Sequence, residues 1–393
     1  MKLARVLRVT AISLLLGLLA LPASGAEVDK SENVKLLKRF EYPGTTGDFF
    51  QGGTDIDFSG KYVYAAQQGL AGGIHIYDAS KKVPKEVGFV ACPGSQNDVA
   101  VVKPGLIAIG YHSSSCGTPG KGVRLVNVKN PKRPKLLGQV ELSDGTHTLT
   151  VYPGKPIIYA SPGGLPINGD GTQQILDVSN PKKPKVAATL DTNPSGCHDV
   201  TFDIRKDRKI AFCPGLTEVQ IWDVSDPLAP EGIGHIVNPL MFFPHSATVS
   251  SDGEFVVIGD ENFAVNECVG GPTGAIFMYD LSNLNAPIPM GYFGINRGAT
   301  PISSPDLDRA NWCTAHLFNF VPGTRTLVAS WYGSGMNVID LSDPSSPTEI
   351  EHYAGDDVNY WSAYWYDGRI WANDRVHGLD VFTVKGLKEG KKG

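Results

Sequence analysis

The sequence has little that would place it in a membrane or on nucleic acid. After Leu21 it contains no apolar run long enough to span a bilayer, so we expect no membrane span in the mature chain. It contains no basic run before the lysines of its C-terminal tail, and its formal net charge is −5. Nucleic-acid backbones are bound mainly by clustered lysine and arginine. Nucleic acid is therefore not expected as a partner.

The sequence also lacks the motifs of several common enzyme classes. It has no GxSxG nucleophile elbow, no HExxH helix and no P-loop. Its six cysteines do not form the CxxC pairs of a structural zinc site. Any chemistry must therefore come from residues that the fold brings together.

The first 26 residues have the pattern of a secretory signal. Lys2, Arg5 and Arg8 precede a short apolar stretch, residues 11–21, and small residues follow it at 22–26. We expect cleavage after Ala26, with Gly25 as the near alternative, and a secreted or periplasmic mature chain. A retained N-terminal anchor is the other interpretation. The apolar stretch is short for a membrane span, which favours cleavage.

A turn motif recurs through the rest of the chain. In six segments a strand rich in β-branched or aromatic residues ends in Asp or Asn, and three of the six continue as S-[DN]-P-x-x-P. The Asp or Asn side chain can bond to the backbone of the turn, and proline cannot continue a strand ladder. We therefore assign these residues a structural role. The six segments begin at Ile76, Leu125, Ile175, Ile221, Met278 and Val338.

The repeat predicts an all-β, seven-bladed propeller. Each unit has room for four short strands. Repeats that are long enough for four strands and rich in strand and turn content are typical of propellers. The last unit is one strand short, and residues 34–42 resemble the outer strands of other units. We therefore expect strand 34–42 to complete blade seven and close a single domain, residues 27–393. The predicted inner strands begin near Thr54, Asn97, His147, His198, His245, His316 and Trp361.

The recurring [VIL]-x-D-[VL]-S-[DN]-P signature resembles the LVIVD-repeat family of secreted β-propeller proteins. The resemblance covers nearly the whole mature chain and implies the fold. It does not imply a reaction, because the family is named for its repeat. Function has to be argued from the site.

Four histidines open four successive units at the same place: His147, His198, His245 and His316. In a propeller the first residues of the inner strands ring the mouth of the central channel, so these imidazoles are expected to converge. Such a set could bind water and backbone alone, but convergence of four favours a shared transition metal. Imidazoles without a thiolate favour iron or copper, and zinc is the other candidate.

Two further residues are expected to orient the metal ligands. Glu261 follows the second strand of blade five and should lie beside His245, where its carboxylate could bind the free N–H of a ligand histidine. Asn97 occupies the histidine position of blade two. Asp199, next to His198, is expected to point away from the channel and to be structural.

The cysteines fall at the histidine-bearing face when they are placed on the repeat. Cys92 and Cys116 belong to one blade, and Cys197 and Cys213 stand in the same relation on another. Cys268 lies in the loop between the second and third strands of blade five, and Cys313 just before the inner strand of blade six. We predict three disulfides with these pairs, which suits an oxidising compartment. A long insertion, Asn296–Trp312, is expected to form a partial lid on the same face.

Three functions remain open on the sequence. The first is a metal-dependent oxidoreductase acting on a small or apolar molecule at the histidine-bearing face. The second is a non-catalytic propeller that binds a protein or a cell surface through that face. The third is a metal carrier, which four ligands without an open position would favour. The substrate, the metal and the oligomeric state do not follow from the sequence.

Overall fold

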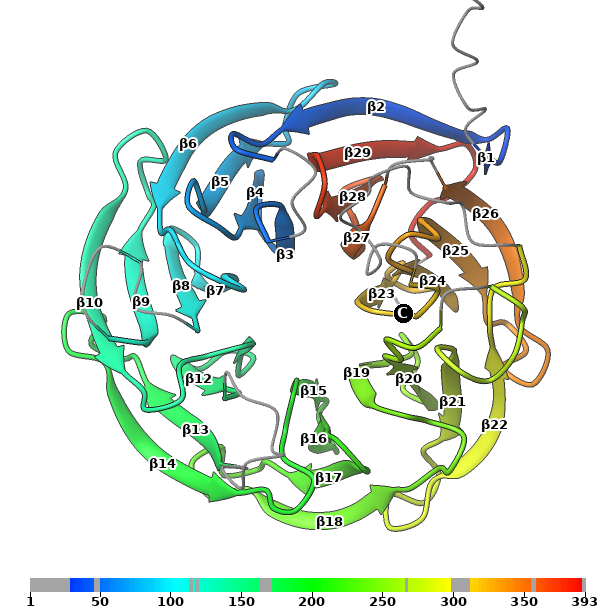
Figure 1. The fold of residues 1–393 in the computed structure, drawn as a ribbon. Coiled ribbons are helices and arrows are strands. Elements are labelled where there is room, and N and C mark those ends of the chain that lie inside the picture. Colours follow the sequence, from blue (N-terminus) through cyan, green and yellow to red (C-terminus); the bar gives the residue numbers. More distant parts are fainter. Residues whose placement is uncertain are drawn as a thin grey trace, which may run out of the picture.

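The computed structural model confirms the predicted seven-bladed propeller. Seven antiparallel sheets surround a central channel, each with its innermost strand at the channel (Figure 1). No helix in the described part of the chain is long and apolar enough to cross a membrane. The structure describes residues 29–45, 50–112, 116, 120–162, 172–265, 268–297, 312–354 and 358–390.

Blades one to four each use four strands that are consecutive in the sequence, from the channel outward. Blade one has β3 (Gly53–Ser59), β4 (Tyr62–Gln67), β5 (Gly73–Asp78) and β6 (Lys85–Ala91). Blade two has β7 (Asp98–Lys103), β8 (Leu106–Tyr111), β9 (Gly122–Asn127) and β10 (Lys135–Glu141). Blade three has β11 (Leu149–Val151), β12 (Ile157–Ala160), β13 (Thr172–Asp177) and β14 (Lys185–Asp191). Blade four has β15 (Thr201–Ile204), β16 (Lys209–Pro214), β17 (Val219–Asp223) and β18 (Glu231–Ile236).

Blades five to seven follow the same order, and the N-terminal strands join the last two. Blade five has β19 (Pro244–Val249), β20 (Phe255–Asp260), β21 (Ile276–Asp280) and β22 (Ile288–Phe293). Blade six has β23 (Phe318–Phe320), β24 (Thr326–Ser330), β25 (Met336–Asp340) and β26 (Thr348–Ala354), with β1 (Asp29–Lys30) outside them. Blade seven has β27 (Tyr360–Tyr366), β28 (Arg369–Asp374), β29 (Gly378–Val384) and, outermost, β2 (Val34–Glu41).

The two ends of the chain fasten the ring as predicted. Strand β2 pairs antiparallel with β29, from Val34 opposite Val384 to Glu41 opposite Gly378. The short strand β1 pairs with β26, so the N-terminal segment bridges blades six and seven (Figure 1). The predicted signal peptide, residues 1–26, lies outside the described residues. The same holds for most of the predicted lid, since residues 298–311 are not described.

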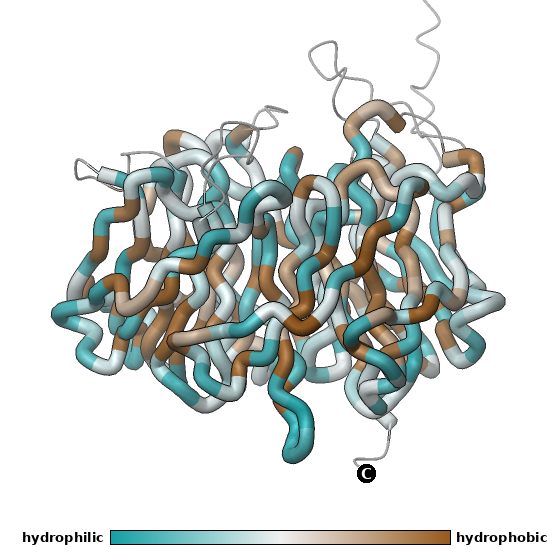
Figure 2. The backbone as a smooth tube through the Cα atoms, turned by 90° about the horizontal axis from the view of Figure 1, so that it is seen from below, coloured by the Kyte–Doolittle hydropathy of each residue, from teal (hydrophilic) through white to brown (hydrophobic). Residues whose placement is uncertain are grey.

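The hydrophobic core is divided among the interfaces between neighbouring blades. Seven large clusters of buried apolar residues each combine strands of two adjacent blades, including one that joins blade seven to blade one. A side view shows apolar positions alternating with polar ones along the strands (Figure 2). Because every blade depends on its neighbours for burial, the ring must be closed to be stable.

The recurring turns hold neighbouring blades together at their outer edges. The Asp78 carboxylate accepts hydrogen bonds from the Ser80 N–H and hydroxyl, as predicted for a turn residue. Four of the six turns also pack on a glycine of the preceding blade's outer strand. A Cβ atom on Gly88 would lie 1.8 Å from the carbonyl oxygen of Pro131, and one on Gly138 would lie 2.7 Å from that of Pro181. These glycines permit a backbone approach that a side chain would block.

Candidate metal centre

The four histidines occupy the same structural position in their blades. For three of them the backbone N–H donates to a carbonyl oxygen at the end of the blade's second strand, which fixes the height of the side chain in the channel. The pairs are His147–Ser161 at 2.9 Å, His198–Pro214 at 2.8 Å and His316–Ser330 at 3.0 Å.

The fourth histidine, His245, lies on a β-bulge. The pairing of β19 with β20 shifts between Pro244 and Ser246, so His245 has no partner in the ladder. Blade seven has the same irregularity at Trp361, between Tyr360 and Ser362. A bulge re-aims the side chain at the irregular position. It turns His245 toward its neighbours at the channel mouth.

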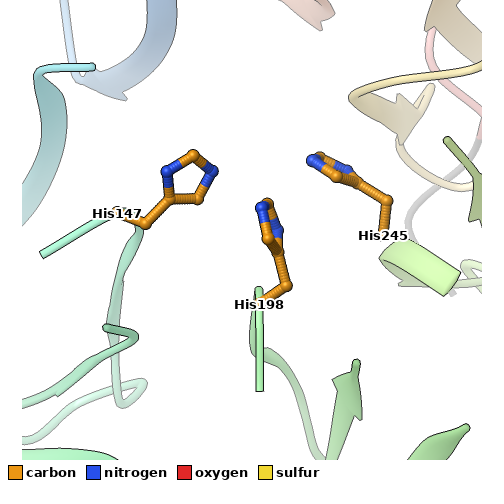
Figure 3. A group of neighbouring side chains, drawn as sticks. All are labelled: His147, His198 and His245. Carbon is orange, nitrogen blue, oxygen red and sulfur yellow. The ribbon is translucent and has the colours of Figure 1, made fainter. Parts of the chain in front are cut away.

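The imidazoles form a continuous arc across blades three to six. Ring centroids are 4.1 Å apart for His147 and His198, 4.2 Å for His198 and His245, and 4.3 Å for His245 and His316. Figure 3 shows His147, His198 and His245 directed at a common region from three separate blades. The structure thus brings together the four histidines that the repeat predicts at one place.

The arc contains two overlapping groups of ligand atoms. One atom from each of His147, His198 and His245 lies within 4.8 Å of the others, and the same is true of His245, Glu261 and His316. His245 belongs to both groups. The first group is the more accessible, with His147 9% exposed, whereas all members of the second are at most 3% exposed.

Glu261 lies at the buried end of the arc, between two histidines. Its Oε2 atom is 3.3 Å from His245 Nε2 and its Oε1 atom is 3.5 Å from His316 Nε2. The Tyr332 hydroxyl donates to Oε1 at 2.5 Å. Asp260 fixes the base of this loop, because its carboxylate accepts the backbone N–H groups of Phe243 and Gly274. Glu261 therefore contacts two histidines rather than the single one expected.

At the other end of the arc, two residues outside the four histidine positions support His147. The Nδ1 atom of His147 is 2.9 Å from His112 Nε2 and 3.1 Å from Gln96 Oε1. Gln96 has a φ of 50°, a left-handed conformation that a glutamine rarely adopts. Tyr332, which contacts Glu261, has a φ of 40°. Strain of this kind is concentrated at functional sites.

The structure gives Asn97 a different role from the one expected. Its side-chain N–H groups donate to the backbone carbonyls of Gln67 at 2.8 Å and Cys92 at 2.6 Å. Its Oδ1 atom has no hydrogen-bond partner among the described residues. Asn97 therefore holds backbone segments together, and its neighbour Gln96 makes the contact with His147.

A buried arginine completes the sealed end of the arc. Arg375 lies 4.6 Å from the centre of the Trp361 ring, and the Trp361 carbonyl oxygen is 2.5 Å from His316 Nδ1. Arg375 follows the end of β28 just as Glu261 follows the end of β20, so register along the repeat could have identified it. Its positive charge faces Glu261 and Tyr332 in a region that water does not reach.

Burial controls the charge of this site. It lowers the pKa of His147, His198, His245 and His316 well below the usual value, and neighbouring histidines act in the same direction. These imidazoles are therefore neutral at pH 7, and a neutral ring offers a lone pair to a metal. Burial also raises the pKa of Glu261 to about 8, against the hydrogen bond from Tyr332 and the charge of Arg375.

All three predicted disulfides are present. They join Cys92 to Cys116, Cys197 to Cys213, and Cys268 to Cys313. No thiol is left free among the cysteines, so none can serve as a metal ligand. Three disulfides are compatible with an extracellular or periplasmic protein.

Comparison with known protein families identifies the repeat. Residues 327–355 match the family model described as LVIVD repeat. The matched stretch contains the second to fourth strands of blade six and the turn after Asp340. The chain is a seven-bladed propeller whose sixth blade matches the LVIVD repeat. No curated protein matches it. The match covers one blade and names no reaction, so the histidine arc has to be interpreted on its own chemistry.

Proposed function

We propose that the protein binds a transition-metal ion at the channel mouth through His147, His198 and His245. The observation that carries this proposal is the convergence of one ligand atom from each of three blades to within 4.8 Å. His316 continues the arc on the buried side. Metal coordination gives a reason for placing so many neutral imidazoles together, with single nitrogens of His198, His245 and His316 left unpaired among the described residues.

The donor set fits iron, copper or zinc. Neutral imidazoles bind these ions well and bind calcium or magnesium poorly. The Nδ1 atoms of His198 and His245 are buried and have no hydrogen-bond partner among the described residues. Native proteins pair nearly all buried polar atoms, so unpaired ring nitrogens point to a ligand. On the far side of His147, His112 and Gln96 occupy Nδ1 and would orient the ring, as partners of metal-bound histidines do.

We further propose that the metal serves a reaction, with an oxidoreductase as the best-supported class. Three protein ligands leave a coordination position open, which is the arrangement of catalytic rather than structural sites. Iron and copper would supply redox chemistry when bound. Aromatic side chains, including Phe243 and Trp361, lie against the histidines and suit a small apolar substrate. The N-terminal signal pattern and the disulfides support export to the periplasm or the medium.

Elemental analysis of protein purified without a histidine tag tests the metal site. We expect bound Fe, Cu or Zn in the wild type and a large loss in a His147→Ala/His198→Ala double variant. His235→Ala is the matched control, because this exposed histidine lies on the outer strand β18. A folded wild type that contains no metal, and takes up none on titration, would overturn the proposal. It would leave the non-catalytic binding propeller as the interpretation.

A redox cycle then separates an enzyme from a carrier. The metal of an oxidoreductase should be reduced by a small reductant and reoxidised by air while it stays bound, as followed by its visible spectrum. A carrier should instead release its metal to a competing chelator within minutes. Rapid release without a redox response would exclude the oxidoreductase.

A further inference from the structure

The buried end of the arc has the dimensions of a binding site for a second metal ion. A tetrahedral ion with bonds of about 2.1 Å has ligand atoms about 3.4 Å apart. Glu261 Oε2 lies 3.3 Å from His245 Nε2, and Glu261 Oε1 lies 3.5 Å from His316 Nε2. These separations are long for hydrogen bonds between such groups. They match the edges of a metal coordination shell.

The protonation pattern at His316 also calls for a cation. Its Nδ1 atom faces the Trp361 carbonyl oxygen at 2.5 Å, and a carbonyl can only accept, so Nδ1 carries the proton. The Nε2 atom of the neutral ring therefore has a lone pair and makes no hydrogen bond among the described residues. It faces Glu261 Oε1, which already accepts the Tyr332 hydroxyl. In the metal-free site only a proton held by Glu261 can bridge these two acceptors. Their 3.5 Å separation is long for that hydrogen bond, so a cation between them fits the geometry better.

His245 can take part in both groups because its ring has two nitrogens. Its Nε2 atom faces Glu261, while its Nδ1 atom is buried without a hydrogen-bond partner among the described residues. The two nitrogens lie on different edges of the ring. A neutral ring has only one lone pair, so binding an ion at each nitrogen requires the ring to release its N–H proton to solvent and to bridge the two ions as an imidazolate. His245 stands in the middle of the arc, next to His198 on one side and His316 on the other.

We propose that the protein holds a second transition-metal ion, bound by Glu261, His245 and His316, and that His245 is shared between the two metal positions. This inference rests on the proposed function, since it extends the same centre. Two imidazoles and a carboxylate suit zinc or iron, with copper also accepted. The second ion would be shielded by Tyr332 and Trp361, whose rings lie against His316, so substrate would meet only the first ion.

Titration of metal-free protein with Co²⁺, followed by visible absorption and elemental analysis, tests this proposal. We expect two equivalents in the wild type, one in Glu261→Gln and one in His198→Ala. His316→Ala should match Glu261→Gln, which gives a second route if one variant folds poorly. Glu231→Gln, an exposed carboxylate on β18, is the control and should bind two. Thermal unfolding of each metal-free variant checks that the fold is retained.

The possible results separate the two proposals. One equivalent in the wild type, lost in His198→Ala and unchanged in Glu261→Gln, would overturn the second position and leave the first standing. Two equivalents that persist in both Glu261→Gln and His316→Ala would place the second ion elsewhere and also overturn it. No binding at all would overturn the proposed function itself.

Discussion

The central channel contains two neighbouring layers of polar side chains that differ in how their polar atoms are satisfied. The histidine layer consists of His147, His198, His245 and His316 at the mouth. The carboxylate layer consists of Asp55, Asp57, Asp98 and Asp199, which line a cavity of about 450 Å³ to which all seven inner strands contribute. His198 and Asp199 are consecutive in the sequence, so the two layers are separated by a single step along the chain.

In the carboxylate layer, backbone N–H groups donate hydrogen bonds to the carboxylates. Asp98 accepts the N–H groups of Val99 at 2.7 Å and of Leu149, in the next blade, at 2.5 Å. Asp57 accepts the N–H of Val101, also in the next blade, at 2.6 Å. These carboxylates therefore join adjacent blades at the axis, which is a structural role.

The histidine layer is not satisfied in this way. Nitrogens of His198, His245 and His316 are buried without hydrogen-bond partners among the described residues. Buried polar groups that serve only the fold are normally paired. Burial and convergence are common to both layers. Only the histidine layer has buried atoms without hydrogen-bond partners among the described residues, and this difference marks it as the layer that binds a ligand.

The largest expected effect is a difference in metal affinity between a variant of the histidine layer and a variant of the carboxylate layer. His198→Ala should weaken metal binding at the first position by more than about 100-fold. Removing a residue that bonds to a metal ligand lowers metal affinity by up to about 100-fold, and removing the ligand itself should lower it further. Asp98→Asn should leave metal affinity unchanged. Competition with a chromophoric chelator measures both affinities. A comparable loss in Asp98→Asn would show that the carboxylate layer takes part in binding, and the contrast would fail.

The second prediction tests the structural role of Asp98. Asp98→Ala should lower the free energy of unfolding by about 2–4 kcal/mol, because it leaves the Val99 and Leu149 N–H groups unpaired in the channel. Asp98→Asn keeps an acceptor and should cost much less. Urea unfolding of the metal-free proteins provides the measurement. Equal stability of the alanine variant and the wild type would remove the structural assignment.

The third prediction concerns the support of the buried metal position. Tyr332→Phe removes the hydroxyl that donates to Glu261 and should weaken the second position about 10-fold, with the first unchanged. The two steps of a Co²⁺ titration separate these affinities. Tyr364→Phe is the matched control, since its hydroxyl donates to Asp55 in the carboxylate layer. If both variants behave alike, Tyr332 has no special relation to the metal.

The repeat was sufficient to predict the fold and the convergence of the histidines. Residues at the same position of successive blades lie at the same height around the axis, so register along the sequence becomes proximity in space. The same logic placed Glu261 near His245. It does not reveal which nitrogen of His245 faces Glu261, because a bulge sets the orientation of that ring.

Other contacts depend on local backbone conformation that the repeat does not encode. Gln96 reaches His147 from a left-handed backbone conformation, whereas the repeat predicts its neighbour Asn97 in that role. The expectation that Asp199 points away from the channel was wrong, since Asp199 lines the channel cavity. Alternation applies within a strand, but His198 and Asp199 precede β15, which begins at Thr201.

The smallest expected effect is a pH dependence that belongs to the carboxylate layer. Burial raises the pKa of Asp199 to about 7, so the folded state keeps a proton that the unfolded state loses near pH 4. Between these values the folded state binds more protons, and its stability falls as pH rises. The buried histidines have lowered pKa values and produce the opposite slope. The contribution of Asp199 therefore has to be measured as a difference between two proteins.

Asp199→Asn removes this titration while leaving the histidines in place. Relative to the wild type, the variant should become more stable by on the order of 1 kcal/mol between pH 5 and pH 8. The effect is modest because Asp199 is only partly shielded from water in the channel. Thermal unfolding of both metal-free proteins across this range gives the difference. A constant difference would mean that Asp199 is ionised throughout, and a difference of opposite sign would mean that the folded state stabilises its charge. In either case Asp199 would be negatively charged in the folded protein, and the carboxylate layer would attract cations. The two layers would then differ in the kind of ion that each prefers.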